Sequence, residues 1–136
     1  MNRLLLRLAL ASGVLAAQDS DLAVRAVKVL EQKCQMCHGP SLAQSGLNLH
    51  SRDAALKGGT RGPSIVAGNA AQSRLIQAVR RTGDLAMPPG PKLAESEIAT
   101  LEQWVAAGAA WPKAVVTPAN QSWWSFRKPV RPPVPA

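Results

Sequence analysis

The stretch Cys34-Gln35-Met36-Cys37-His38 places two thiols and an imidazole side by side in the chain. Residues three apart share one face of a helical turn, so both sulfurs can point in the same direction. The imidazole follows at once and can reach a metal on that side. The pattern C-x-x-C-H is the attachment motif of c-type haem, whose two vinyl groups form thioethers with the cysteines. The sequence therefore predicts one covalent haem c, with His38 as an iron ligand.

Three other interpretations of the same cysteines are weaker. A thioredoxin-type dithiol needs alternating strands and helices, and the chain shows no such pattern. A zinc site needs a fourth ligand, for which His50 is the only other histidine. A structural disulfide between Cys34 and Cys37 is the third alternative.

The composition supports a cofactor-filled interior. The chain has 136 residues and a formal net charge of +8, which suits one small domain with extensions. Only 24 of the 119 residues after residue 17 are Leu, Ile, Val or Phe, and Tyr is absent. This content is low for a globular domain. We therefore expect a bulky apolar group to complete the core.

The first 17 residues resemble an export signal. Arg3 and Arg7 flank a short leucine-rich run, and small residues precede the polar segment that starts at Gln18. The run is too short for a membrane span, although an uncleaved anchor is the alternative. We expect cleavage after Ala16 or Ala17 and a mature domain in the periplasm or another extracytoplasmic space. Loss of the two arginines lowers the charge from +8 to +6.

The remaining chain predicts helices joined by long loops. Apolar residues recur at helical spacing in three segments, and 84–92 is an extended loop because of its prolines. Apart from one short helical turn, residues 41–69 are expected to form a loop. The expected helices are 21–36, 70–82 and 95–107, with one helical turn at 53–56. No pattern continues into residues 113–136, a Trp- and Pro-rich basic tail.

A six-coordinate haem needs a second axial ligand, for which Met87 is the preferred candidate. It lies in the extended segment Ala86-Met87-Pro88-Pro89, where prolines fix the loop beside a thioether. A Met/His pair raises the reduction potential relative to two imidazoles. His50 is the alternative ligand, and an open iron position is a further alternative.

Residues around the haem are predicted more loosely. A ligating histidine usually donates its other N–H to a carbonyl, and the Pro63 carbonyl is the candidate acceptor. Trp104 is expected to pack against the macrocycle or the first helix. Four arginines are candidates for pairing with the haem propionates, namely Arg52, Arg61, Arg80 and Arg81.

An ordered set of motifs extends this interpretation over about residues 29–112. The segments are 34–40 (CQMCHGP), 46–52 (GLNLHSR), 73–80 (SRLIQAVR), 87–89 (MPP) and 98–109 (IATLEQWVAAGA). Together they resemble the planctomycete-type cytochrome c domain, a branch of the class I cytochrome c-like fold. The resemblance implies an all-α fold around one covalent haem, with His38 proximal and Met87 distal. His50 stands where the family usually has Asp.

The resulting domain organisation has three parts. Residues 1–17 are the signal peptide, 18–112 the haem domain, and 113–136 a tail or linker towards an absent following domain. The resemblance implies that such domains usually head larger exported proteins, and Trp123-Trp124-Ser125-Phe126 looks like the entrance to the next one.

One-electron transfer is the function that the sequence favours, with the protein acting as a carrier rather than a catalyst. A peroxidase-like enzyme with open or bis-histidine iron is one alternative, and a redox or docking module of a larger protein is another. The positive charge favours an acidic redox partner. Nucleic-acid binding is disfavoured because the basic residues are scattered and carry no recognition motif. No membrane span is expected in the mature chain.

Overall fold

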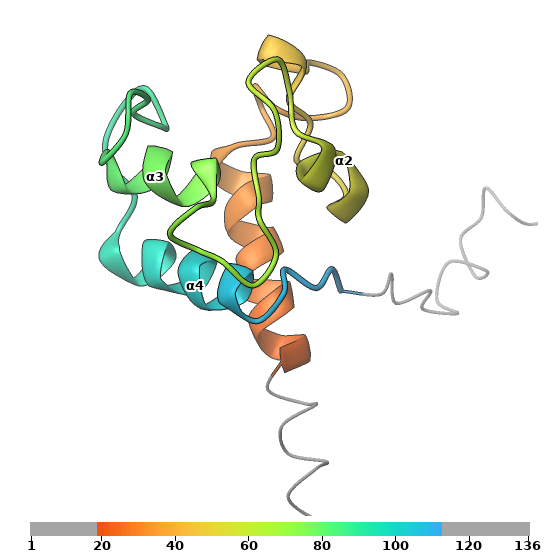
Figure 1. The fold of residues 1–136 in the computed structure, drawn as a ribbon, viewed down its shortest axis with the longest axis vertical. Helices are drawn as coiled ribbons and strands as arrows, with labels where there is room; N and C mark the ends of the chain where they lie inside the picture. Colours follow the sequence, from red (N-terminus) through yellow and green to blue (C-terminus); the bar gives the residue numbers. More distant parts are fainter. Residues whose placement is uncertain (1–18, 113–136) are drawn as a thin grey trace, which may run out of the picture.

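The computed structural model describes residues 19–112, which fold into helices linked by long loops (Figure 1). No strand occurs within this range, where only two isolated bridges pair His38 with Ala43 and Gly59 with Gly62. The predicted all-α class is confirmed. The elements are an N-terminal helix at 19–33, the 3₁₀ turn η1 at Gln44–Gly46, and the helices α2 at Arg52–Lys57, α3 at Arg74–Arg80 and α4 at Glu95–Ala106.

The N-terminal helix ends three residues earlier than expected, at residue 33. The Leu30 carbonyl accepts the N–H groups of both Cys34, at 2.9 Å, and Gln35, at 3.0 Å, which closes the last turn. The Cys34 carbonyl then accepts from Cys37 at 3.1 Å and from His38 at 2.9 Å. The C-x-x-C-H motif therefore lies on a tight turn directly after the helix.

Helix α3 is shorter than the predicted segment 70–82 because a buried serine organises the chain before it. The Ser73 hydroxyl accepts from the Val66 N–H and donates to the Asn69 carbonyl, both at 2.8 Å. These bonds fix residues 66–73 as a loop, and the helix starts at Arg74. It ends at Arg80, where the next residue takes the left-handed conformation.

The other expected elements occur where the sequence placed them. The turn predicted at 53–56 is α2, whose N-cap Ser51 accepts from the Ala54 N–H at 3.3 Å. Helix α4 starts after Ala94, whose N–H donates to the Glu97 carboxylate at 3.0 Å. Gly108 follows its end with φ +98, a conformation that glycine adopts without strain. The segment 84–92 contains no helix, as predicted.

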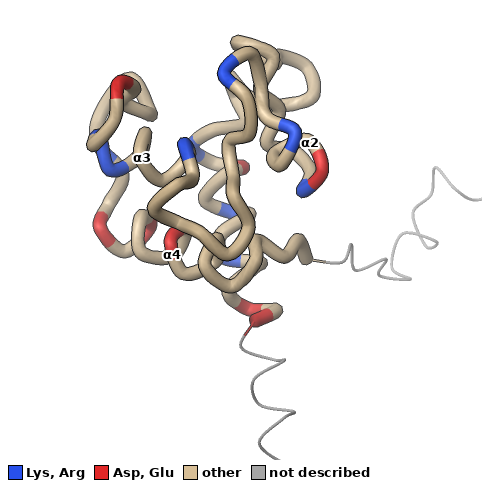
Figure 2. The backbone as a smooth tube through the Cα atoms, viewed as in Figure 1, with Lys and Arg blue, Asp and Glu red and all other residues tan. Residues whose placement is uncertain are grey.

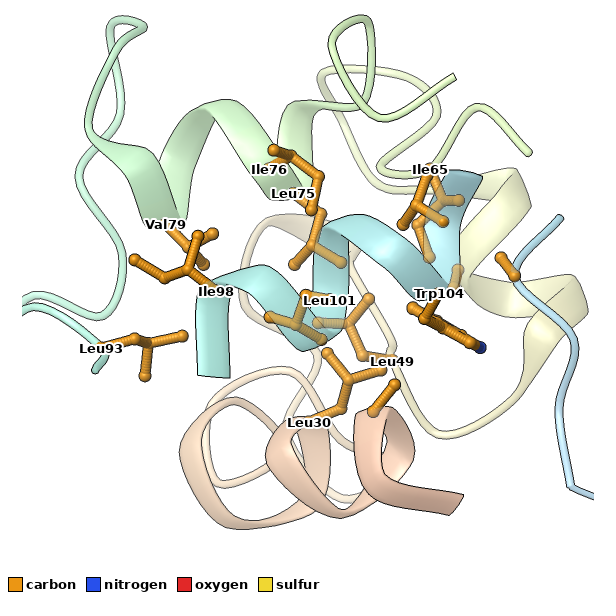
Figure 3. Close-up of a cluster of buried hydrophobic side chains, with 14 of the residues drawn as sticks. Leu30, Leu49, Ile65, Leu75, Ile76, Val79, Leu93, Ile98, Leu101 and Trp104 are labelled. Atoms are coloured by element: carbon orange, nitrogen blue, oxygen red, sulfur yellow. The ribbon is translucent and has the colours of Figure 1, made fainter. Parts of the chain in front are cut away.

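The hydrophobic core joins α4 to the N-terminal helix and α3 (Figure 3). Leu30, Ile98 and Leu101 are fully buried, and Trp104 lies at the far end of the same cluster. Leu75 and Val79 of α3 join the cluster on one side. This core holds the helices that carry the cavity described below.

Two predictions fall outside the described residues. The signal peptide and the tail at 113–136 lie in parts of the chain of which the structure says nothing. Within 19–112, no helix has the length and apolar character needed to cross a membrane.

Candidate cofactor site

An open cavity lies between the motif turn and the segment that carries Met87. Its empty space is about 1100 Å³ with the open mouth included. Cys34, Cys37 and His38 line one part of it, and Met87 and Pro88 line another. The structure thus brings together two thiols, an imidazole and a thioether that are up to 53 positions apart in the sequence.

The wall of the cavity is largely apolar. Leu75, Ala78 and Val79 contribute one side of α3, and Leu47 and Leu49 come from the loop after η1. These side chains can exclude water from a bound group but offer it no hydrogen bonds. The cavity therefore suits a large apolar ligand.

Glycines shape the loop that forms another wall. Gly59 lines the cavity, and the neighbouring Thr60 N–H donates to the Ser45 carbonyl at 2.8 Å. A Cβ on Gly58 would meet the Gly62 carbonyl, and a Cβ on Gly59 would meet the Ser45 carbonyl. Larger residues at these two positions would push the loop away from its neighbours.

His38 has a buried nitrogen without a partner. Its Nδ1 makes no hydrogen bond, although its backbone N–H and carbonyl are bonded to Cys34 and to Leu49. The bond to the Pro63 carbonyl is not formed in this structure, but Gly62 and Ser64 on either side of Pro63 both line the cavity. A buried polar atom without a hydrogen-bond partner lowers the stability of the fold. The unpartnered Nδ1 therefore indicates a functional role for His38.

Both cysteines are free and half-buried, so the disulfide alternative is not formed. Burial raises the pKa of the Cys34 thiol to about 11, and the nearby Glu97 carboxylate adds to the shift. Within residues 19–112, no three His, Cys, Asp or Glu side chains are arranged to hold a metal ion. The geometry gives the zinc alternative no support.

Met87 and His50, the two candidates for the second axial ligand, differ in position. Met87 lines the cavity, and its backbone N–H donates to the Ala78 carbonyl of α3 at 3.0 Å. His50 is exposed and is absent from the cavity lining. Only the methionine shares the cavity with His38.

The four arginines predicted as haem contacts differ in whether they line the cavity. Arg61 lines the cavity and pairs with Asp84. Arg52 does not line it, because its guanidinium donates to the Gly108 and Ala109 carbonyls at 3.1 Å each and so ties α2 to the end of α4. Arg80 and Arg81 are also outside the lining and bond to other parts of the chain.

Sequence reasoning missed Arg74, which lines the cavity from the first position of α3. Its position relative to the apolar residues of the same helix could have indicated that it faces the cavity. Arg74 lies four residues before Ala78, as Leu75 lies four before Val79, and all four line the cavity. Residues four apart share a helix face.

Trp104 contributes to the core rather than to the cavity. It is buried with Leu30 of the N-terminal helix in one cluster, and it is absent from the cavity lining. Its Nε1–H donates to the Ala110 carbonyl at 2.6 Å, and Trp111 packs edge-on at a centroid distance of 5.2 Å. Trp104 thus belongs to the same buried cluster as residues of the first helix.

The C-x-x-C-H turn and the methionine thus face one largely apolar cavity in a helical part of the chain. Residues 34–91 match the family model for planctomycete cytochrome c. The match starts at Cys34 and ends just beyond Met87, so it is narrower than the expected 29–112 and leaves α4 outside. The predicted resemblance is confirmed over these residues. No curated protein and no solved structure matches the chain.

Proposed function

We propose that this chain is an exported c-type cytochrome that carries single electrons through one covalently attached haem. The observation that carries the proposal is the shared cavity of the C-x-x-C-H turn and Met87. The family match independently supports haem-based electron transfer.

The residues present fit such a group. Cys34 and Cys37 offer two thiols at the cavity wall, and the unpartnered imidazole of His38 offers a nitrogen ligand. The thioether of Met87, in the same cavity, offers a second ligand. Haem iron supplies a centre that accepts and returns one electron, and the protein tunes its potential through the axial ligands.

The apolar wall has a defined task in this proposal. Leu75, Val79 and Leu49 would cover part of the macrocycle and reduce the access of water to it. A peroxidase-like site would need an acid–base group beside the iron. His50, the only candidate, is exposed and outside the cavity lining.

Polar groups at the wall would orient the macrocycle. Arg61 and Arg74 both line the cavity, and guanidinium groups pair well with carboxylates such as the haem propionates. The Pro63 carbonyl would accept a hydrogen bond from the His38 Nδ1–H when the imidazole binds the iron. Arg52 and Trp104 would act indirectly, by holding α2 and α4 in place.

The cellular setting is part of the same proposal. Residues 1–17 would direct export, and c-type haem would be attached outside the cytoplasm. The net charge of +6 that remains after loss of Arg3 and Arg7 would favour an acidic redox partner through electrostatic steering. The tail at 113–136 would connect the haem domain to a larger exported protein.

Two methionines allow a matched test of the iron ligation. Met36 lies inside the motif but is 85% exposed, whereas Met87 faces the cavity. We expect Met87→Ala to keep its haem but to lose the far-red absorption band of thioether–iron ligation and to titrate at a lower reduction potential. Met36→Ala should retain both properties. A Met87→Ala protein with the wild-type band and potential would refute the assignment.

A further inference from the structure

The segment 84–91 that carries Met87 has few means of holding itself in place. Three of its residues are prolines, which lack a backbone N–H. Its carbonyl groups therefore find few donors within the segment. We call this segment the methionine loop.

Arg81 supplies the missing donors. Its guanidinium donates to the Gly90 carbonyl at 2.5 Å and to the Pro88 carbonyl at 3.4 Å. The two acceptors lie on either side of Pro89, just after Met87. Arg61 contacts the start of the same loop through Asp84, and the Met87 N–H bonds to Ala78. The loop is thus held at its beginning, middle and end.

The backbone at Arg81 sets the position of this side chain. Arg81 ends α3 in the left-handed conformation, at φ 61 and ψ 37, and its N–H donates to the Ala78 carbonyl. This conformation is unfavourable for residues with a side chain, and helices commonly end on glycine there. A glycine does follow two positions later, at Gly83. The guanidinium contacts give a reason for an arginine at the strained position.

We propose that Arg81 is a positioning residue that holds the methionine loop against α3 and so keeps the Met87 thioether directed at the cavity. This inference rests on the proposed role of Met87 as an iron ligand. It gives Arg81 a different role from the propionate contact expected from the sequence.

The test combines backbone-compatible variants with a measurement that needs no haem. Arg81→Gly and Arg81→Asn both tolerate the left-handed conformation and both remove the guanidinium. Arg25→Gln removes the same charge from the exposed face of the N-terminal helix and serves as the control. Hydrogen exchange is measured on the full chain at the amide of Met87, whose N–H donates to the Ala78 carbonyl.

We expect exchange at the Met87 amide to become about tenfold faster in both Arg81 variants, with Arg81→Lys in between. The buried amides of α4 should keep their wild-type rates, because the effect is local. In haem-loaded protein the same variants should lose intensity in the far-red band at unchanged haem content. Arg25→Gln should match the wild type in every measurement.

Three results would overturn the proposal. A Met87 amide that exchanges at the wild-type rate would show that Arg81 does not hold the loop. Faster loop exchange with an unchanged far-red band would show that the contact does not position Met87. Loss of α4 protection in both variants would show a general structural role. Because exchange is also readable without haem, failure of the proposed function is distinguishable from failure of this inference.

Discussion

At the scale of single residues, the clearest functional signal is a polar atom without a partner. His38 Nδ1 is buried and unbonded, while the backbone of the same residue is fully engaged on both sides. The sequence predicted the residue from its place after Cys37. It could not predict the missing bond to Pro63, because that depends on how two distant loops approach each other.

Ser73 shows the opposite case, a buried polar group whose bonds are complete. Its hydroxyl links the Val66 N–H to the Asn69 carbonyl and has no exposure to solvent. We expect Ser73→Ala to lower the free energy of unfolding by about 1–3 kcal/mol, because the Val66 and Asn69 groups lose their partner. Denaturant titration of the full protein measures the change.

Ser96 offers a control for that measurement, since it is an exposed serine in the first turn of α4. Ser96→Ala should change stability by less than about 0.5 kcal/mol. Equal effects of the two substitutions would contradict the structural role assigned to Ser73.

At the scale of elements, a charged pair connects α3 to α4. The guanidinium of Arg80 bonds to both carboxylate oxygens of Glu102, at 2.6 and 2.7 Å, and also reaches Glu95 at 3.0 Å. The hydrogen bond from Arg80 lowers the pKa of the Glu102 carboxyl below its usual value. The pair therefore stabilises the folded state only while Glu102 is ionised.

This linkage sets the pH dependence of Glu102→Gln. A carboxyl with a lowered folded-state pKa contributes stability above its unfolded pKa of about 4.3 and loses it as the pH falls through the folded value. We expect Glu102→Gln to cost about 0.5–1 kcal/mol at pH 7, since the pair is partly exposed. The difference from the wild type should shrink below about pH 4.

Denaturant titrations at several pH values measure this difference. Glu31→Gln removes the same charge from an exposed position on the N-terminal helix and is the control. A Glu102→Gln penalty that persists unchanged in acid would contradict the ionic origin of the stabilisation.

The elements also show which features a sequence reveals. Helix α4 was predicted almost to the residue because its apolar positions recur over three turns between Ala94 and Gly108. The start of α3 was placed too early, since the side-chain bonds of Ser73 compete with the helix and have no periodic signature. Arg52 was predicted at the haem, but only tertiary structure shows that it bonds to the end of α4.

At the scale of the whole molecule, the hydrophobic core also supplies part of the cavity wall. Leu30, Leu101 and Trp104 belong to the core alone, whereas Leu75 and Val79 belong to the core and line the cavity. The shortage of large apolar residues in the sequence agrees with this arrangement. Within residues 19–112, the basic residues occur on several elements and loops rather than on one element (Figure 2).

The most direct test is the mass and thiol content of the mature protein, without its signal peptide, purified after export in a host that attaches c-type haem. We expect a coloured protein whose mass exceeds that of the polypeptide by one haem, with no thiol open to alkylation. A Cys34→Ala, Cys37→Ala double variant should lack the covalent haem. A colourless, folded wild-type protein whose two thiols react freely or bind zinc would contradict the covalent haem on which the proposed function depends.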